Sequence, residues 1–78
     1  MITMRYYAAA RAAAGVVSEE VAASTLEEAL IVVRDRHGSA LDRVLQRCSF
    51  LVDGAQARPS TSLPDGAVVE VLPPFAGG

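Results

Sequence analysis

The sequence predicts one α+β domain, in which a mixed sheet of about five strands is covered on one face by one main helix. Three observations lead to this prediction. Apolar residues make up 51% of the 78 residues, which is enough to form a core and unlike a disordered chain. One segment has the apolar period of an amphipathic helix. The segments around it alternate or are rich in β-branched residues, and turn residues separate them.

The first two strands are expected to form a hairpin. Residues 2–7 alternate between apolar and more polar side chains, which is the period of a half-buried strand. Residues 8–14 are almost all alanine and favour a helix. Because only about two turns fit before Gly15, we interpret them as a loop or a short helical turn. Residues 16–22 are predicted to form the second strand, with Glu19-Glu20 on a solvated edge.

The clearest element is a helix over residues 25–37. Two overlapping pairs have the spacing of a capping box: Ser24 with Glu27, and Thr25 with Glu28. One apolar stripe follows at helical spacing and consists of Leu26, Ala29, Leu30 and Val33. Gly38 stands where a helix commonly ends, and His37 is expected to help cap that end.

The middle of the chain predicts a short helical turn and then a second hairpin. Residues 41–45 have the pattern of a brief amphipathic turn. Residues 49–52 are apolar and lead into Asp53-Gly54, a strong hairpin signal. A short returning strand is predicted over residues 55–58, and Pro59 stops it because proline cannot donate to the ladder.

The last strand is predicted over residues 67–72. It follows a turn at Pro64-Asp65-Gly66 and stops at Pro73-Pro74. The order is therefore strand, strand, helix, short helix and three strands, and the last strand can lie in the centre beside the first. One helix across a mixed sheet is the β-grasp arrangement. We predict a β-grasp domain over residues 1–72 and an extended, flexible tail over residues 73–78.

Composition and charge exclude several classes of function. The chain has seven Arg, no Lys and nine acids, for a net charge of −2, and no basic patch that would predict nucleic-acid binding. No apolar run is long enough to span a membrane, and the first residues do not have the pattern of a signal peptide. Cys48 is the single cysteine, so neither an internal disulfide nor a cysteine metal cluster is expected. These features predict a reduced, cytoplasmic protein.

The end of the chain carries the most specific pattern. Residues 63–78 read Leu-Pro-Asp-Gly-Ala-Val-Val-Glu-Val-Leu-Pro-Pro-Phe-Ala-Gly-Gly, and they closely resemble the C-terminus of the MoaD/ThiS sulfur-carrier family. Residues 6–11 with Gly15 also resemble the aromatic-Ala-x-x-Arg…Gly opening of that family. Ala12 departs from the pattern, since many relatives carry Glu there, and Phe75 stands where Val or Ile is more usual. The resemblance covers the whole chain and implies a ubiquitin-like β-grasp fold.

The resemblance implies that Gly78 is the reacting residue. A ubiquitin-activating-like adenylyltransferase, similar to MoeB, would use ATP to convert its carboxyl group into a glycyl adenylate. A sulfur donor protein would then displace AMP and leave a thiocarboxylate, 1-thioglycine. Because Gly77 and Gly78 lack a Cβ, they can pass through a channel too narrow for any side chain.

Within the family, the likeness is greatest to the small subunits of molybdopterin synthases. It implies that the tail enters a MoaE-like large subunit and donates sulfur to cyclic pyranopterin monophosphate, which forms molybdopterin. The chain itself offers no catalytic triad, carboxylate pair or phosphate-binding loop. The catalytic residues are therefore expected on the large subunit, and this chain is expected to donate sulfur without binding a cofactor or a metal.

The residues before the glycines are assigned to partner binding. They are Pro73, Pro74, Phe75 and Ala76. Two prolines make a stiff stalk that loses little entropy on entering a channel, although they also serve simply to stop the strand. Phe75 is expected to fill a pocket on the partner, with packing back on its own sheet as the alternative. A sheet face left open by the helix is the expected docking surface, with Val69, Val71 and Phe75 near it.

Four other side chains receive structural or open assignments. Of Tyr6 and Tyr7, one is expected to face the core and the other solvent. Cys48 is interpreted as a small, buried apolar residue. Arg11 either contacts a partner or fixes a loop by hydrogen bonds to nearby carbonyl groups, and the sequence does not choose between these roles.

Other functions remain open at this stage. The chain could carry sulfur for another pathway, such as the synthesis of thiamin thiazole, cysteine or a tungsten cofactor, although the Pro-Pro-x-Ala-Gly-Gly ending favours molybdopterin. A ubiquitin-like modifier, joined through Gly78 to a lysine of a target protein, would use the same two glycines. An interaction module with an inert end is a third hypothesis.

Overall fold

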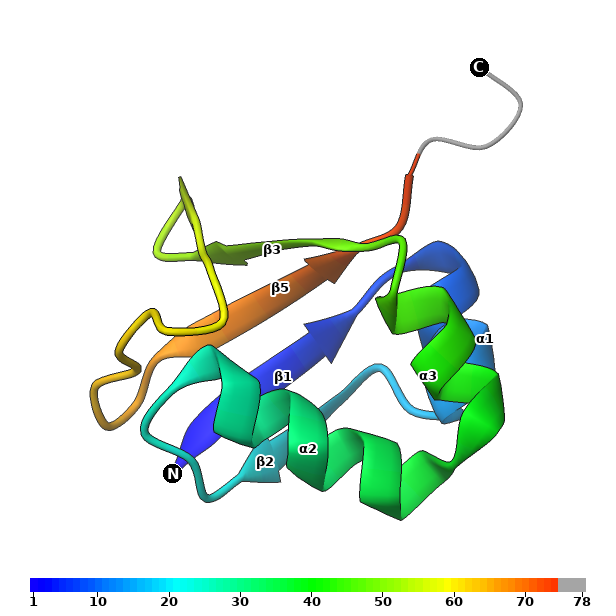
Figure 1. Ribbon diagram of the computed structural model, residues 1–78, viewed down its shortest axis with the longest axis horizontal. Coiled ribbons are helices and arrows are strands. Elements are labelled where there is room, and N and C mark those ends of the chain that lie inside the picture. Colours follow the sequence, from blue (N-terminus) through cyan, green and yellow to red (C-terminus); the bar gives the residue numbers. More distant parts are fainter. Residues whose placement is uncertain (75–78) are drawn as a thin grey trace.

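The computed structural model describes residues 1–74, which form two layers with the helices together on one side of a sheet (Figure 1). The strands are β1 (Ile2–Tyr6), β2 (Ser18–Val21), β3 (Ser49–Val52), β4 (Ala55–Gln56) and β5 (Val68–Leu72). The helices are α1 (Ala8–Ala14), α2 (Leu26–His37) and α3 (Ser39–Leu45). The predicted mixed five-stranded sheet with one main helix is confirmed. The predicted short helical turn over residues 41–45 is also confirmed, as the longer helix α3, and α1 completes the helical layer.

The last strand lies in the centre of the sheet, as predicted. The strand order is β2-β1-β5-β3-β4. β1 pairs with β2 in antiparallel fashion and with β5 in parallel, and β3 is antiparallel to both β5 and β4. Since β5 leads directly into residues 73 and 74, the segment that presents the tail is held by ladders on both sides.

The core lies between the inner face of the sheet and α2. β1 contributes Ile2, Met4 and Tyr6, all at most 1% exposed, and α2 contributes the predicted apolar stripe. Val69 and Val71 of β5 are both 0% exposed, so the prediction that they lie near an open docking face is wrong. Side chains alternate along a strand, and β5 turns these two toward the helices.

Residues 8–14 form a two-turn helix, so of the two interpretations, a loop or a short helical turn, the helical one is confirmed. α1 packs against α3, and Ala10 and Ala14 are buried. Alanine combines high helix propensity with a small side chain, so two short helices can approach closely and stabilise each other. Gly15 ends α1 with φ +77°, a left-handed conformation that glycine adopts without strain. β2 then begins only at Ser18, two residues later than predicted.

The start of α2 confirms one of the two predicted capping boxes. Thr25 is the N-cap, and its Oγ1 accepts a hydrogen bond from the Glu28 amide at 3.2 Å. The Glu28 carboxylate accepts in turn from the Ser24 amide at 2.8 Å. At the other end Gly38 is the cap, as predicted, and its amide donates to the carbonyl oxygen of Arg34. The Nε2 of His37 lies 2.6 Å from the carboxylate of Glu19 on β2, so the predicted capping role of His37 is wrong.

The second hairpin is shorter than predicted. Asp53 and Gly54 have φ of +51° and +79°, the two positive values that a tight two-residue hairpin turn requires. β4 covers only Ala55–Gln56, where the sequence predicted a strand as far as Arg58. The hairpin therefore closes the free edge of β3 with a minimal strand.

Candidate functional site

The reacting end predicted from the sequence lies outside the described residues. Phe75, Ala76, Gly77 and Gly78 all follow residue 74, so their roles stay predictions. What the structure does place is the root of the tail, where Pro73 is half-buried and Pro74 is exposed. These two prolines form the tail root.

The tail root is fixed by the strand before it. Leu72 pairs with Ser49 of β3, and Val71 pairs with Tyr6 of β1 as well as with Phe50 of β3. In Figure 1 the chain leaves β5 at the end of the sheet where α1 and the connection from α3 to β3 also lie. The tail therefore starts at a rigid position, close to the two short helices.

A groove of about 520 Å³ lies beside the tail root. It is lined by Ala9 of α1, by Arg43 and Val44 of α3, by Gln46 and Arg47 just after α3, and by Pro73 and Pro74. Neither Arg43 nor Arg47 was among the site residues predicted from the sequence. Their spacing of four residues, which places both on one side of a helical segment, was the signal available.

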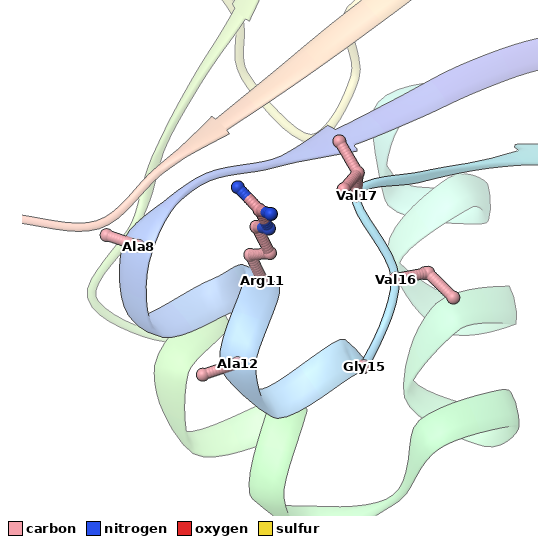
Figure 2. A pocket seen from close by; sticks show the side chains of 6 residues that line it. All are labelled: Ala8, Arg11, Ala12, Gly15, Val16 and Val17. Atoms are coloured by element: carbon pink, nitrogen blue, oxygen red, sulfur yellow. The ribbon is translucent and has the colours of Figure 1, made fainter.

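A second groove, also of about 520 Å³, contains Arg11. Figure 2 shows the Arg11 side chain projecting from α1, with Val16 and Val17 bordering it from the segment before β2. Arg11 is exposed. Among residues 1–74 its guanidinium makes no hydrogen bond, so the loop-fixing role is not found there.

A cluster of polar side chains joins β1, β2 and the end of α2 around Glu19. The Glu19 carboxylate accepts hydrogen bonds from the Tyr6 hydroxyl at 2.5 Å and from Arg36 at 2.8 Å, and the Nε2 of His37 lies 2.6 Å from it. The Tyr6 and His37 rings also meet edge to face, with centroids 6.4 Å apart. Glu19 is 12% exposed, so its predicted place on a solvated edge is wrong, although Glu20 is exposed as predicted.

The Glu19 cluster shifts two ionisation equilibria. Burial alone raises the pKa of Glu19, but the hydrogen bonds from Tyr6, Arg36 and His37 outweigh it and hold the pKa below its ordinary value. Burial, reinforced by the hydrogen bond to Glu19, raises the pKa of the Tyr6 phenol. The carboxylate is therefore ionised and the phenol protonated at neutral pH. These are the forms in which the hydrogen bonds of Glu19 join the sheet to the end of α2.

Replacing Glu19 by glutamine is expected to lower the free energy of unfolding at pH 7 by about 1.5–3 kcal/mol, because it removes a charged hydrogen-bond acceptor with three partners. The folded pKa of Glu19 is depressed, so its stabilisation is fully present above the unfolded value of 4.5 and is lost as pH falls through the folded pKa. Urea unfolding at several pH values measures both effects. Glu20→Gln is the matched control, and equal losses in the two variants would contradict the prediction.

The remaining assigned side chains are structural. Tyr6 faces the core as predicted, and Tyr7 is half-buried on the outer face, where its hydroxyl donates to Glu70 at 2.8 Å. The Cys48 thiol is half-buried, packs against the core and donates to the carbonyl of Val44 at 3.2 Å. Burial raises the pKa of the Cys48 thiol, so its reactive thiolate form is disfavoured.

Within residues 1–74, no group of three or more His, Cys, Asp or Glu side chains is arranged to hold a metal ion. None of the helices described above is long and apolar enough to cross a membrane.

The ThiS family model matches residues 4–78 of the sequence. The comparison with curated proteins gave no match. Among solved structures, SAMP1 of Haloferax volcanii is 23% identical with a TM-score of 0.86, and covers 99% of this chain and 98% of its own. CysO in the BexX/CysO complex of Amycolatopsis orientalis is 21% identical with a TM-score of 0.84, over 100% of both chains.

A third similar structure is the complex of subunits 1 and 2 of the molybdopterin-converting factor of Helicobacter pylori. The matched chain of that complex is 22% identical with a TM-score of 0.74, over 99% of this chain and 97% of its own length. These three likenesses confirm the predicted ubiquitin-like β-grasp fold over nearly the whole chain. At such identities they speak for the fold alone.

Proposed function

The chain belongs to the ThiS family, the sulfur-carrier family that its sequence resembles, and on this premise we propose that it carries sulfur on Gly78 as the small subunit of a molybdopterin synthase. The observation that carries the proposal is the extent of the family match, which runs from residue 4 to residue 78 and so includes both glycines. The fold supports it, because the central strand β5 leads directly into the tail.

The proposed chemistry takes place in three steps. The Gly78 carboxylate attacks the α-phosphate of ATP on a separate activating enzyme, which releases pyrophosphate and gives an acyl adenylate. A sulfur donor protein then supplies sulfide, whose sulfur attacks the acyl carbon and displaces AMP, which forms the thiocarboxylate. In the large subunit, that sulfur is passed to cyclic pyranopterin monophosphate, and water supplies the oxygen that restores the Gly78 carboxylate. The ATP-dependent steps would occur in the cytoplasm.

In this proposal the chain supplies a reacting end and a scaffold. Gly77 and Gly78 enter the partner's channel, and Pro73, Pro74, Phe75 and Ala76 contact its walls. Two of the similar structures were solved together with a second protein, subunit 2 in Helicobacter pylori and BexX in Amycolatopsis orientalis. This supports the proposal that the chain works in a complex whose other member provides the catalytic groups.

Two rival functions use the same tail. A sulfur carrier for thiamin thiazole, cysteine or tungsten-cofactor synthesis would be charged in the same way but would meet a different acceptor. A protein modifier would form an amide with a lysine of a target, and the likeness to SAMP1, a small archaeal modifier protein, favours including it. Covalent adducts of this chain in extracts would support the modifier.

Intact mass spectrometry tests the proposal directly. The purified chain is incubated with ATP, a sulfide source and an activating enzyme, in parallel with a variant that lacks Gly78. We expect the full chain to gain the mass difference between sulfur and oxygen, and the shortened chain to gain nothing. No gain with an enzyme that charges its own cognate carrier would contradict the proposal. The large subunit that co-purifies with the charged chain then identifies the pathway.

A further inference from the structure

The groove beside the tail root has a charge that the domain itself does not balance. Arg43 and Arg47 both line it, and both are exposed. Asp42, the acid on α3, is already engaged, since its carboxylate pairs with Arg34 at 2.8 Å. Among residues 1–74, neither groove arginine takes part in an ion pair. Two positive charges therefore stand side by side on a chain whose net charge is −2.

The length of the tail brings this groove into any complex that uses Gly78. Gly78 is the fourth residue after Pro74, and a fully extended chain spans at most about 3.3–3.6 Å per residue. The reacting carboxyl group therefore reaches no more than roughly 13–14 Å beyond the tail root. An enzyme that encloses Gly77 and Gly78 must bring its surface close to Pro73 and Pro74, which form one wall of the groove.

Covering the groove has an electrostatic consequence. Removing two guanidinium groups from water is unfavourable unless carboxylates replace the lost hydration. Arginine suits this role, because its planar fork can donate two parallel hydrogen bonds to one carboxylate. The apolar lining from Ala9 and Val44 adds a surface that excludes water around such a pair.

We propose that Arg43 and Arg47 form a docking site for carboxylate side chains at the mouth of the channel through which the activating enzyme takes the tail. This inference rests on the proposed function, and it assigns to α3 a role that the tail alone does not provide. The arginines attract the enzyme's carboxylates as the two proteins meet, and they fix the position of the docked chain. The chemistry at Gly78 does not involve them. They are therefore positioning residues.

The test measures ATP-dependent activation as pyrophosphate release, at varied concentrations of the chain. Arg43→Gln and Arg47→Gln are each expected to lower kcat/KM about fivefold, through a higher KM with unchanged kcat. Arg58→Gln is the matched control, because it removes one exposed positive charge outside the groove, and it is expected to change kcat/KM less than about twofold. Arg47→Lys keeps the charge but loses the planar fork, so its kcat/KM is expected to lie between those of wild type and Arg47→Gln. Raising the salt concentration should reduce the difference in kcat/KM between wild type and the two groove variants.

Three other outcomes would overturn the proposal. Equal effects of Arg43→Gln, Arg47→Gln and Arg58→Gln would show that only net charge matters. A higher kcat/KM in the groove variants would show that the arginines hold the chain's own Gly78 carboxylate instead. A lower kcat at unchanged KM would place them in the chemistry. Thermal unfolding of each variant checks that the fold is intact. Failure of the wild-type chain to be activated at all would instead count against the proposed function.

Discussion

Replacing Gly77 by valine is expected to slow activation of the tail by about 100-fold or more. In the proposed complex this residue lies in a channel that excludes side chains, so a branched Cβ would displace the Gly78 carboxylate from the α-phosphate of ATP. A misplacement of about 1 Å is enough to cost two orders of magnitude in rate. Because residue 77 is predicted to belong to the tail and not to the β-grasp domain, we expect the temperature of unfolding to stay unchanged.

Pyrophosphate release in a single turnover measures this effect. Ala22→Val is the control, since it also places a branched valine side chain, at an exposed position between β2 and α2, and it should be activated at the wild-type rate. If Gly77→Val were activated as fast as wild type, the tail would not pass through a narrow channel, and the proposed role of the two glycines would be wrong.

Replacing Leu30 by alanine is expected to lower the free energy of unfolding by about 2–5 kcal/mol. Leu30 is 6% exposed and belongs to the stripe of α2 that packs on the sheet. Truncation both removes buried apolar surface and leaves a cavity that the surrounding side chains fill only in part. For a domain of this size, each 1 kcal/mol lowers the temperature of unfolding by about 4–8 °C.

The neighbouring residue provides the control for this experiment. Ile31 follows Leu30 on the same helix but is 57% exposed, so Ile31→Ala should change the free energy of unfolding by no more than about 0.5 kcal/mol. Thermal and urea unfolding of both variants compare the two positions directly. Similar losses would mean that α2 packs with a different face toward the sheet.

Elements defined by local patterns could be predicted from the sequence. The alternation in β1, the capping box of Thr25 and Glu28, and the Asp53-Gly54 turn each depend on residues that are close together along the chain. The predicted position of β5 beside β1 was also confirmed. The short helices were harder to predict from the sequence, because a seven-residue helix is unstable alone. α1 and α3 are stable because they pack on each other.

The inward face of β5 could not be read from its sequence. Residues 68–72 are Val-Val-Glu-Val-Leu, so both phases of the alternation are mostly apolar and either one fits a core. The structure turns Val69 and Val71 inward and leaves Val68 and Leu72 half-buried on the other face. The ambiguity is a property of strands that are apolar on both sides.

The Glu19 cluster depends on pairing that a local pattern does not contain. Its partners Arg36 and His37 lie 17 and 18 residues further along the chain. The register of β1 and β2 sets Glu19 opposite Met4, which turns its side chain toward the helical layer. A glutamate next to another glutamate is ordinarily solvated, so only the tertiary structure reveals that this one is bound.

The candidate site also has one part that the sequence predicts and one part that only the structure shows. The proposed reacting residue, Gly78, and its neighbours come from the sequence alone. The groove with Arg43 and Arg47 depends on α3 lying beside Pro73 and Pro74, a contact between parts of the chain about 30 residues apart that no local pattern predicts.

The central position of β5 has a mechanical consequence. A partner that draws in the tail pulls along the axis of this strand, and the hydrogen bonds to β1 and β3 lie across that axis, so both ladders are loaded in shear. Shear loads many bonds at once, and a central strand shares the load between two ladders where an edge strand has only one. An enzyme can therefore bind the domain, draw in its tail and release it without unfolding the domain.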